Sequence, residues 1–326
     1  MSNLNKLLIA NRGEIAIRIT RAAQELGLTA VAIYPEDDAQ SLHVRLADEA
    51  VLLEGRGASA YLDIAQIVQL AKDAGCDGVH PGYGFLSENA NFAAAVEAAN
   101  MTFIGPSVAA LDAFGDKAKA RALAQACDVP VVAGLSEAIS IEQAQAFFAA
   151  HADSGILLKA IAGGGGRGMR IVRSADELVD AFTRCQSEAL AAFGNDGLYA
   201  EQLVASPRHI EVQIIGDGSG AVSHIWEREC SLQRRHQKLV EIAPSPTLDP
   251  AIRDAMCAAA VRLGQEINYA GLGTIEFLLD TNANEFFFIE ANARLQVEHT
   301  VTEEVTGIDL VRAQIEVAGG ASLNDL

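Results

Sequence analysis

The sequence predicts an α/β protein with more than one domain, and three observations support this prediction. Its 326 residues exceed the roughly 100 to 200 residues of an ordinary domain. Half of the residues are hydrophobic but only 6% are aromatic, which is typical of alanine-rich α/β proteins. Short apolar runs alternate with helical segments from Lys6 to about Gly105, and this βαβα order predicts a parallel sheet.

The elements of this first region follow from its periodicity. Four apolar runs read LLIA, TAVAIY, GVHPGY and TFIGP, and helical patterns cover residues 14–26 and 60–74. A connecting helix then ends before Pro130, and the run VPVVAG begins a new unit. We therefore expect a boundary near residue 130.

Two further units follow. The segments ILLKA and MRIV predict two strands joined by a glycine loop, and Ser174 with Glu177 predicts a capping box that starts a helix. The run YAEQLV ends this small unit near residue 203. From His209 on, the order is a hairpin (EVQII and AVSHIWE around GDGSG), a long polar stretch, a helix over residues 250–267, and the strands TIEFLLD and EFFFIEAN.

Composition excludes several kinds of partner. With 24 Lys and Arg against 43 Asp and Glu, the formal net charge is −19, which repels nucleic acid. The longest apolar run, Ala255 to Val261, has seven residues, far below the roughly 18 of a membrane span. The N-terminal segment lacks the apolar core of a signal peptide. The five cysteines include no CxxC pair, which argues against disulfides or a zinc site. We expect a cytoplasmic protein with free thiols, no nucleic acid partner and no membrane contact.

Residues 163–168 form a glycine-rich loop that matches GxGxxG. That pattern binds a dinucleotide when the loop opens a helix. Here a strand follows, so a dehydrogenase interpretation fails on context. The loop also lacks the Gly-Lys-Ser/Thr ending of a P-loop. Between two antiparallel strands, bare glycine N–H groups with Arg167 and the preceding Lys159 can cover phosphates as a flap. A hairpin without a ligand is the alternative.

Oxygen ligands for a divalent cation are predicted on two strands. Glu290 and Asn292 point to one face because they are two residues apart, and Glu276 lies on a neighbouring strand. Such oxygens suit Mg²⁺ held with phosphates. Exposed acids paired with surface cations are the alternative. A dense polar run that follows favours a site: Arg294, Gln296, Glu298 and His299.

One local stretch is basic in this acidic chain. Residues 228–238 carry four Lys or Arg against one Glu, and phosphoryl transfer needs cations around developing negative charge. We interpret the stretch as an anion-binding patch. A solvated loop is the alternative.

Eight motifs occur in order along the chain: LLIANRGEIAIRI, HPGYGFLSEN, FGDKAKAR, KAIAGGGGRGMRIV, PRHIEVQI, ERECSLQRRHQKLVEIAPSP, GTIEF and FIEANARLQVEHTVTE. Together they resemble the biotin carboxylase family of the ATP-grasp superfamily, and RECSLQRRHQKLVE and RLQVEHTVTE are the most specific. The resemblance implies a Rossmann-like N-terminal domain (1–115), a connecting helix (116–130), an ATP-grasp lid (131–203) and a C-terminal ATP-grasp α+β domain (204–326). Because the family's last domain continues further, the resemblance implies that this one is incomplete.

The resemblance also implies roles for individual residues. ATP would be bound by Lys117, Lys159, Gly163, Gly164, Gly165, Gly166, Arg167, Gly168, Glu201, Leu203, His209, Gln233 and His236. Glu276, Glu290 and Asn292 would ligate Mg²⁺ or Mn²⁺. Bicarbonate would be held by Arg294, Gln296 and Val297, and catalysis would use Arg294, Glu298 as general base, and Lys238.

The activity implied by the resemblance is ATP-dependent carboxylation of carrier-bound biotin with bicarbonate, through carboxyphosphate, in an acyl-CoA, acetyl-CoA or pyruvate carboxylase. The chain has no Ala-Met-Lys-Met motif for biotin attachment, so a biotin carboxyl carrier protein or domain would be a partner. A carboxyltransferase component and a second copy of the chain in a homodimer are the other partners implied. The alternatives are an ATP-binding fragment with little turnover and a ligase of the carbamoyl phosphate type.

Overall fold

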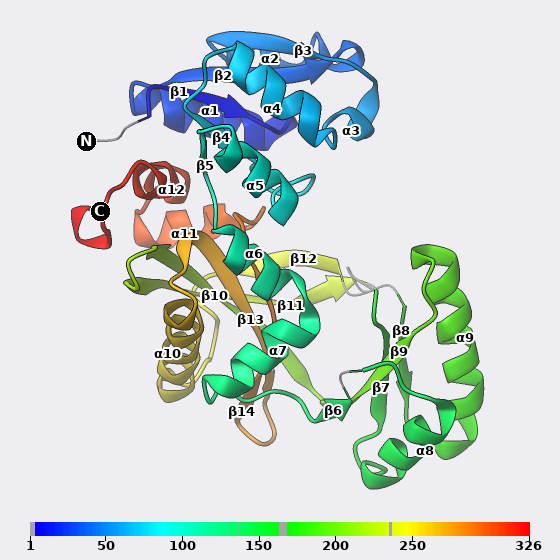
Figure 1. The fold of residues 1–326 in the computed structure, drawn as a ribbon. Helices are drawn as coiled ribbons and strands as arrows, with labels where there is room; N and C mark the ends of the chain where they lie inside the picture. The colour runs from blue at the N-terminus through cyan, green and yellow to red at the C-terminus, as the bar shows by residue number, and fades with distance from the viewer. Residues whose placement is uncertain (1–3, 136, 163–167, 235–236) are drawn as a thin grey trace.

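The structure, a computed structural model, describes residues 4–135, 137–162, 168–234 and 237–326. Three β-sheets form three units of the molecule, as Figure 1 shows. They occupy residues 6–103, 134–202 and 207–292, and the predicted α/β class is confirmed. The loop residues Gly163 to Arg167, and His236, lie outside the described residues.

The first sheet is parallel, with the order β3-β2-β1-β4-β5. Its strands are β1 (Lys6–Ile9), β2 (Thr29–Pro35), β3 (Glu49–Leu53), β4 (Gly78–His80) and β5 (Thr102–Phe103). Its helical segments are α1 (Gly13–Glu25), η1 (Glu36–Asp38), α2 (Leu42–Leu46), α3 (Gly57–Ala60), α4 (Ile64–Asp73) and α5 (Ala90–Ala98). The four predicted runs form β1, β2, β4 and β5, which confirms the parallel sheet.

The helix predicted over residues 60–74 is confirmed over α4, but its start is wrong because residues 61–63 are not helical. The chain leaves α3 after Ala60 and starts α4 at Ile64. Asp63 caps this new helix, because its carboxylate accepts a hydrogen bond from the N–H of Gln66 at 3.0 Å.

Two helices, α6 (Val108–Gly115) and α7 (Lys117–Ala126), connect the first unit to the others. Asp116 caps α7 by accepting from the N–H of Ala118 at 2.8 Å. After α7 the chain touches the edge strand of the large sheet, where the N–H of Phe288 donates to Pro130 O at 2.7 Å. Lys117, at the first position of α7, is thereby brought towards that sheet.

The small unit is an antiparallel sheet with the order β6-β9-β7-β8. Its elements are β6 (Gly134–Leu135), α8 (Ile141–Ala150), β7 (Ile156–Ala160), β8 (Met169–Val172), α9 (Ala175–Phe193) and β9 (Leu198–Gln202). Ser174 and Glu177 form the predicted capping box of α9. The predicted strand, glycine loop and strand are β7 and β8, paired so that Lys159 faces Met169.

The large sheet is antiparallel, with the order β12-β11-β10-β13-β14. Its elements are β10 (Pro207–Asp217), β11 (Val222–Arg234), β12 (Gln237–Ile242), α10 (Pro250–Glu266), β13 (Ala270–Asp280), β14 (Glu285–Asn292), α11 (His299–Thr306), α12 (Leu310–Ala318) and η2 (Leu323–Asp325). Among the described residues, the polar stretch after the predicted hairpin is strand: it forms the end of β11, up to Arg234, and β12.

The buried side chains join the first and large units but leave the small unit with a core of its own. One core cluster runs from the first sheet through α6 and α7 to the large sheet. A second packs Leu7 and Ile15 against Leu310 and Val311 of α12. The small unit has a separate cluster around Phe182. We propose the domain division 1–115, 116–130, 131–203 and 204–326 on this basis.

Two expectations from composition can be compared with the structure. All five cysteines are free thiols, as predicted. Across the described ranges, no helix combines the length and apolar character needed to cross a bilayer.

Candidate active site

A row of charged side chains crosses the large sheet. The register pairs Arg228 with Glu211, Glu211 with Glu276, and Glu276 with Glu290, so that neighbours on β11, β10, β13 and β14 share one face. Glu211 and Arg228 are fully buried and Glu276 is nearly so. Buried charges are retained only where they are paired or bind an ion. This row is the centre of the candidate site.

The three predicted metal ligands are brought together at one end of the row. Asn292 donates from Nδ2 to Glu276 Oε1 at 2.7 Å, and Glu290 stands opposite Glu276. Burial and the charge of Glu276 raise the pKa of Glu290. Burial alone would raise the pKa of Glu276. The hydrogen bond from His209 and the charge of Lys238 outweigh this effect and hold that pKa well below its usual range.

This donor set fits a hard divalent cation. Two carboxylates and an amide lie together, and the mutual repulsion of Glu276 and Glu290 is the kind that a cation between them would relieve. A second group, with donor atoms of His209, Glu211 and Glu276 within 4.8 Å of one another, also lies here. In that group the ammonium of Lys238 already contacts both Glu211 and Glu276, so the first set is the better candidate.

Lys238 lies among three carboxylates. Its Nζ is 2.5 Å from Glu211 Oε2, 2.8 Å from Glu276 Oε1 and 3.0 Å from Glu298 Oε1. Burial opposes ionisation, but the charges of Glu211 and Glu276 raise the pKa of Lys238 far above its usual range. Lys238 is thus a permanent positive charge that connects the metal-ligand set to the predicted base.

Glu298 directly precedes α11. Burial alone would raise the pKa of Glu298, but the charge of Lys238 holds this pKa below its usual range. The carboxylate is therefore ionised at neutral pH and able to accept a proton. Its neighbour Val297 is 60% exposed.

Arg294 and Gln296 are fixed by the protein. Arg294 donates from Nε to Glu88 Oε2 at 2.9 Å and from an Nη to Asn292 Oδ1 at 2.8 Å. Gln296 is buried, and its Nε2 donates to Glu276 Oε1 at 3.3 Å. The predicted bicarbonate residues therefore adjoin the predicted metal ligands.

His209 and Gln233 extend the site along β10 and β11. Gln233 donates from Nε2 to Nδ1 of His209 at 2.9 Å, so the ring's Nε2–H donates to Glu276 Oε2 at 2.5 Å. Burial opposes protonation, but Glu276 raises the pKa of His209. His209 is thus oriented from both sides.

The predicted nucleotide residues of the small unit also pair with each other. Lys159 Nζ is 2.5 Å from Glu201 Oε2, and Arg121 lies 3.6 Å from the other oxygen of Glu201. The pKa of Lys117 is lowered, because burial and the charge of Lys159 outweigh the opposing charge of Glu290. Lys117 is therefore within electrostatic reach of both the small unit and the metal-ligand set.

Backbone hydrogen bonds position Leu203 and Gly168, two further residues of the small unit that are predicted to bind ATP. The N–H of Leu203 donates to Gly155 O at 3.0 Å, and Gly168 O accepts from the N–H of Ala160 at 2.8 Å. Gly168 has a φ of +69°, and a Cβ there would meet Ala160 Cβ at 2.8 Å, so a glycine is required where the loop rejoins the sheet. The flap itself and His236 lie outside the described residues.

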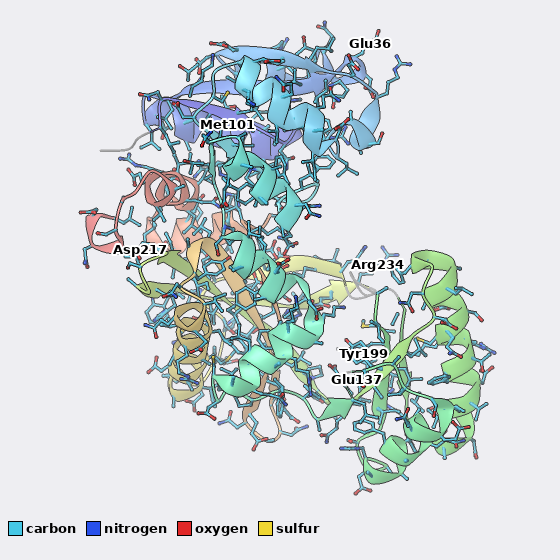
Figure 2. All side chains as sticks on the ribbon, in the orientation of Figure 1. Glu36, Met101, Glu137, Tyr199, Asp217 and Arg234 are labelled. Atoms are coloured by element: carbon cyan, nitrogen blue, oxygen red, sulfur yellow. The ribbon has the colours of Figure 1, made fainter. Side chains whose placement is uncertain are left out.

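The anion-binding patch predicted for residues 228–238 is wrong for Arg228. This side chain is fully buried, because it lies in the middle of the sheet and its donors are occupied by protein oxygens. Arg234 is exposed at the end of β11, on the side of the large unit that points towards the small unit in Figure 2.

Sequence reasoning missed Glu211, Glu88 and Arg121. Glu211 is a single acid within the apolar run of β10, a pattern that could have signalled a buried functional charge. Glu88 and Arg121 carry no such local signal, because each acts on a residue far along the chain.

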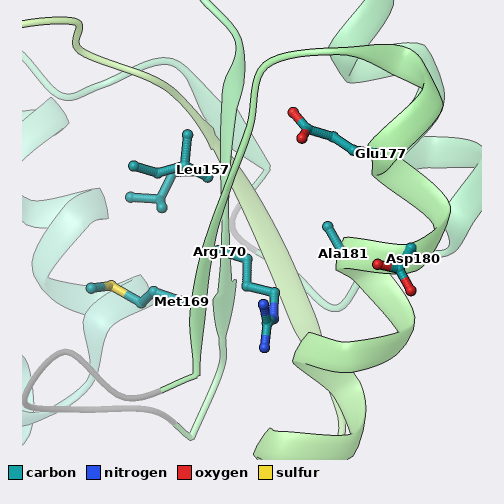
Figure 3. A pocket seen from close by; sticks show the side chains of 7 residues that line it. Leu157, Met169, Arg170, Glu177, Asp180 and Ala181 are labelled. Carbon is teal, nitrogen blue, oxygen red and sulfur yellow. The ribbon is translucent and has the colours of Figure 1, made fainter.

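Two surface hollows lie away from this site. One of about 360 Å³ lies between β8 and α9, where Arg170, Glu177 and Asp180 line it (Figure 3). The other, of about 570 Å³, is lined by Trp226 and Ile308 among others. Neither includes a residue of the predicted site.

Two family models match consecutive parts of the chain. The biotin carboxylase N-terminal domain matches residues 3–111, and the ATP-binding domain of the carbamoyl-phosphate synthase L chain matches residues 116–326. Mitochondrial pyruvate carboxylase of Rattus norvegicus is 52% identical over 327 residues, which cover 99% of this chain and 28% of the rat protein. The chain thus spans less than a third of that relative's length.

Solved structures match over nearly the whole chain. A biotin carboxylase from Campylobacter jejuni, in complex with β,γ-ATP, has a TM-score of 0.93 and 44% identity over 98% of this chain and 72% of its own. The biotin carboxylase domain of Hydrogenobacter thermophilus 2-oxoglutarate carboxylase, with MgADP, ADP and bicarbonate, has a TM-score of 0.92 and 44% identity over 98% of this chain and 70% of its own. Given family models that together span almost all of its residues, the chain belongs to the biotin carboxylase family of the ATP-grasp superfamily.

Proposed function

We propose that the chain carries out ATP-dependent carboxylation of carrier-bound biotin with bicarbonate, through carboxyphosphate, as part of a biotin-dependent carboxylase. The observation that carries this proposal is the position of Lys238. Its ammonium bridges Glu276 of the metal-ligand set and Glu298, the candidate base. A phosphoryl group and a proton acceptor would then meet around one fixed positive charge.

ATP would lie between the small and large units. Lys117, Lys159, the loop from Gly163 to Gly168, Glu201, Leu203, His209, Gln233 and His236 would bind it. Mg²⁺ or Mn²⁺ at Glu276, Glu290 and Asn292 would neutralise phosphate charge when bound. Nucleotide binding would separate Lys159 from Glu201, which frees the ammonium for a phosphate and the carboxylate for a base edge.

Bicarbonate would lie beside Arg294, Gln296 and Val297. Glu298 accepts its proton while a bicarbonate oxygen attacks the γ-phosphorus and the bond to ADP breaks. Lys238 stabilises the charge on the transferred phosphoryl group. The product carboxyphosphate reacts with water, so the small unit would act as a lid that excludes solvent.

Carboxyphosphate would then decay to CO₂ and phosphate. The phosphate removes the ureido N–H proton of biotin, and the nitrogen attacks CO₂. Arg294 would stabilise the negative charge on the ureido oxygen. Biotin would arrive on a carrier protein or domain, and a carboxyltransferase component would pass the carboxyl group to an acyl-CoA or keto acid acceptor.

Release of ADP tests the proposal. Turnover that requires bicarbonate and increases with free biotin would support it. Dependence on glutamine or ammonia would instead indicate a ligase of the carbamoyl phosphate type. ATP binding without any turnover would show that this chain is an ATP-binding fragment.

A further inference from the structure

Arg228 uses every donor it has within the protein. Its side chain is fully buried, and an arginine has five N–H donors and no acceptor. Nε donates to Glu211 Oε1 at 2.5 Å, one Nη to Gln213 at 2.8 Å and Thr302 at 2.9 Å, and the other Nη to Thr274 at 3.3 Å and Gln296 at 2.9 Å. No donor is left for a substrate, so Arg228 acts through its partners.

The contact with Gln296 fixes the direction of an amide. A guanidinium can only donate, so the oxygen of Gln296 must face Arg228. The amide nitrogen must then face the opposite way, where it donates to Glu276 Oε1. Reversing the buried amide would place N–H groups against N–H groups and leave two donors unpaired.

The contact with Glu211 holds a second group. Glu211 is fully buried and gives one oxygen to Arg228 and the other to Lys238. Without Arg228, half of that buried carboxylate would lose its partner, and Lys238 would be drawn towards it. Arg228 is therefore connected through Gln296 to the predicted bicarbonate residues and through Glu211 to Lys238.

We propose that Arg228 is a positioning residue for bicarbonate. By holding the oxygen of Gln296 it turns both N–H donors of that amide to the opposite side, where one donates to Glu276 and the other would meet the anion. This inference rests on the proposed function, because it takes Gln296 as a bicarbonate ligand. An amide oxygen in that place would repel the anion, whereas an N–H group attracts it. Arg228 thus affects bicarbonate more than ATP, whose predicted residues lie largely on other elements.

The variant Arg228→Lys tests this. A lysine keeps the charge, but one nitrogen cannot reach both Glu211 and Gln296. We expect the KM for bicarbonate to rise about tenfold, a loss of about 1.4 kcal/mol, while the KM for ATP changes less than about twofold. Thr302→Val is the matched control, since it removes a different partner of Arg228 and should leave both KM values unchanged. Equal rises of both KM values in Arg228→Lys would overturn the proposal.

A double-mutant cycle identifies the route. If Arg228 acts through Gln296, adding Arg228→Lys to Gln296→Ala should leave the bicarbonate KM within about twofold of the single Gln296→Ala variant. Additive effects would contradict the proposal. Should Arg228→Lys fail to fold, Gln296→Glu replaces it: a carboxylate keeps the bond to Arg228 but offers no N–H, so the same rise is expected. A wild-type bicarbonate KM in Gln296→Glu would overturn the proposal.

A crystal structure of Arg228→Lys separates this inference from the proposed function. We expect the Gln296 amide to reverse or leave Glu276. An unchanged Gln296 would reject the inference even if the wild-type chain is active. An inactive wild-type chain with a displaced Gln296 in the variant would instead reject the proposed function and leave the orienting role of Arg228 supported.

Discussion

Glu276 and Glu290 occupy directly opposed positions on β13 and β14, so that two carboxylates stand side by side on one face of the large sheet. Like charges opposed in this way destabilise a sheet. The two carboxylates repel each other even though Lys238 and His209 offset part of the charge of Glu276. A metal ion that joins Glu276 and Glu290 should therefore stabilise the folded chain.

Glu290→Gln should have opposite effects without and with metal. In metal-free buffer the variant should be more stable, by about 0.5 kcal/mol, because the repulsion is gone. Saturating Mg²⁺ should stabilise the wild type by about 2.7 kcal/mol at a hundred times Kd and the variant much less. Thermal unfolding with EDTA or Mg²⁺ measures both. Glu285→Gln, an exposed position of β14, is the control, and an equal Mg²⁺ response in Glu290→Gln would contradict the site.

Glu298→Gln should remove most of the bicarbonate-dependent ATPase. The amide keeps the shape but cannot take the proton, and loss of a general base costs about 10²- to 10⁴-fold in rate. Steady-state ADP release measures it, and nucleotide affinity should remain near the wild-type value. Glu304→Gln on the exposed side of α11 is the control. A retained wild-type rate in Glu298→Gln would discard the base.

Lys159→Gln should weaken ATP binding. Loss of a charged hydrogen bond to phosphate costs about 1.5 to 3 kcal/mol, which is roughly 10- to 150-fold in Kd. Titration calorimetry with ATP measures it. Lys119→Gln, an exposed lysine on α7, should bind as the wild type does. If both variants bind equally, the bond from Lys159 to Glu201 is structural only.

His80 should make the protein less stable in acid. Burial lowers its pKa to about 3, and its Nδ1 accepts from the N–H of Gly82 at 3.0 Å. The unfolded chain takes up a proton below pH about 6.5 and the folded one does not, so unfolding free energy falls by about 2 kcal/mol by pH 5. Urea unfolding from pH 7.5 to 5 measures this slope. His80→Gln should reduce the slope of unfolding free energy against pH by the amount that corresponds to the uptake of about one proton. An unchanged slope would contradict the assignment of this pH dependence to His80.

The local pattern of apolar residues predicted those strands that are largely buried. The runs that became β1, β2, β4, β13 and β14 are apolar, and each was recognised. The strands β3 and β12 were missed because both are edge strands with mostly exposed side chains, so neither shows the alternation that marks a half-buried strand.

The site was predictable to the extent that its residues share a strand or a motif. Spacing alone placed Glu290 and Asn292 on one face, and Glu276 beside them. The partner of Arg294 could not be found this way, because Glu88 is 206 positions earlier and reaches it only through the packing of the first unit on the large one. The charge of Arg228 was interpreted as a surface feature because sequence does not show burial.

The helix α12 completes a layer that begins with α1. Leu310 and Val311 of α12 share one apolar cluster with Leu7 and Ile15. Arg18 of α1 also forms ion pairs with Glu303 at 2.9 Å and with Asp309 at 2.5 Å. Protein synthesis proceeds from the N-terminus, so a nascent chain displays this apolar face of its first unit until α12 leaves the ribosome. The first unit is thus expected to mature only after α12 has been synthesised, and shielding by a chaperone would matter most during that interval.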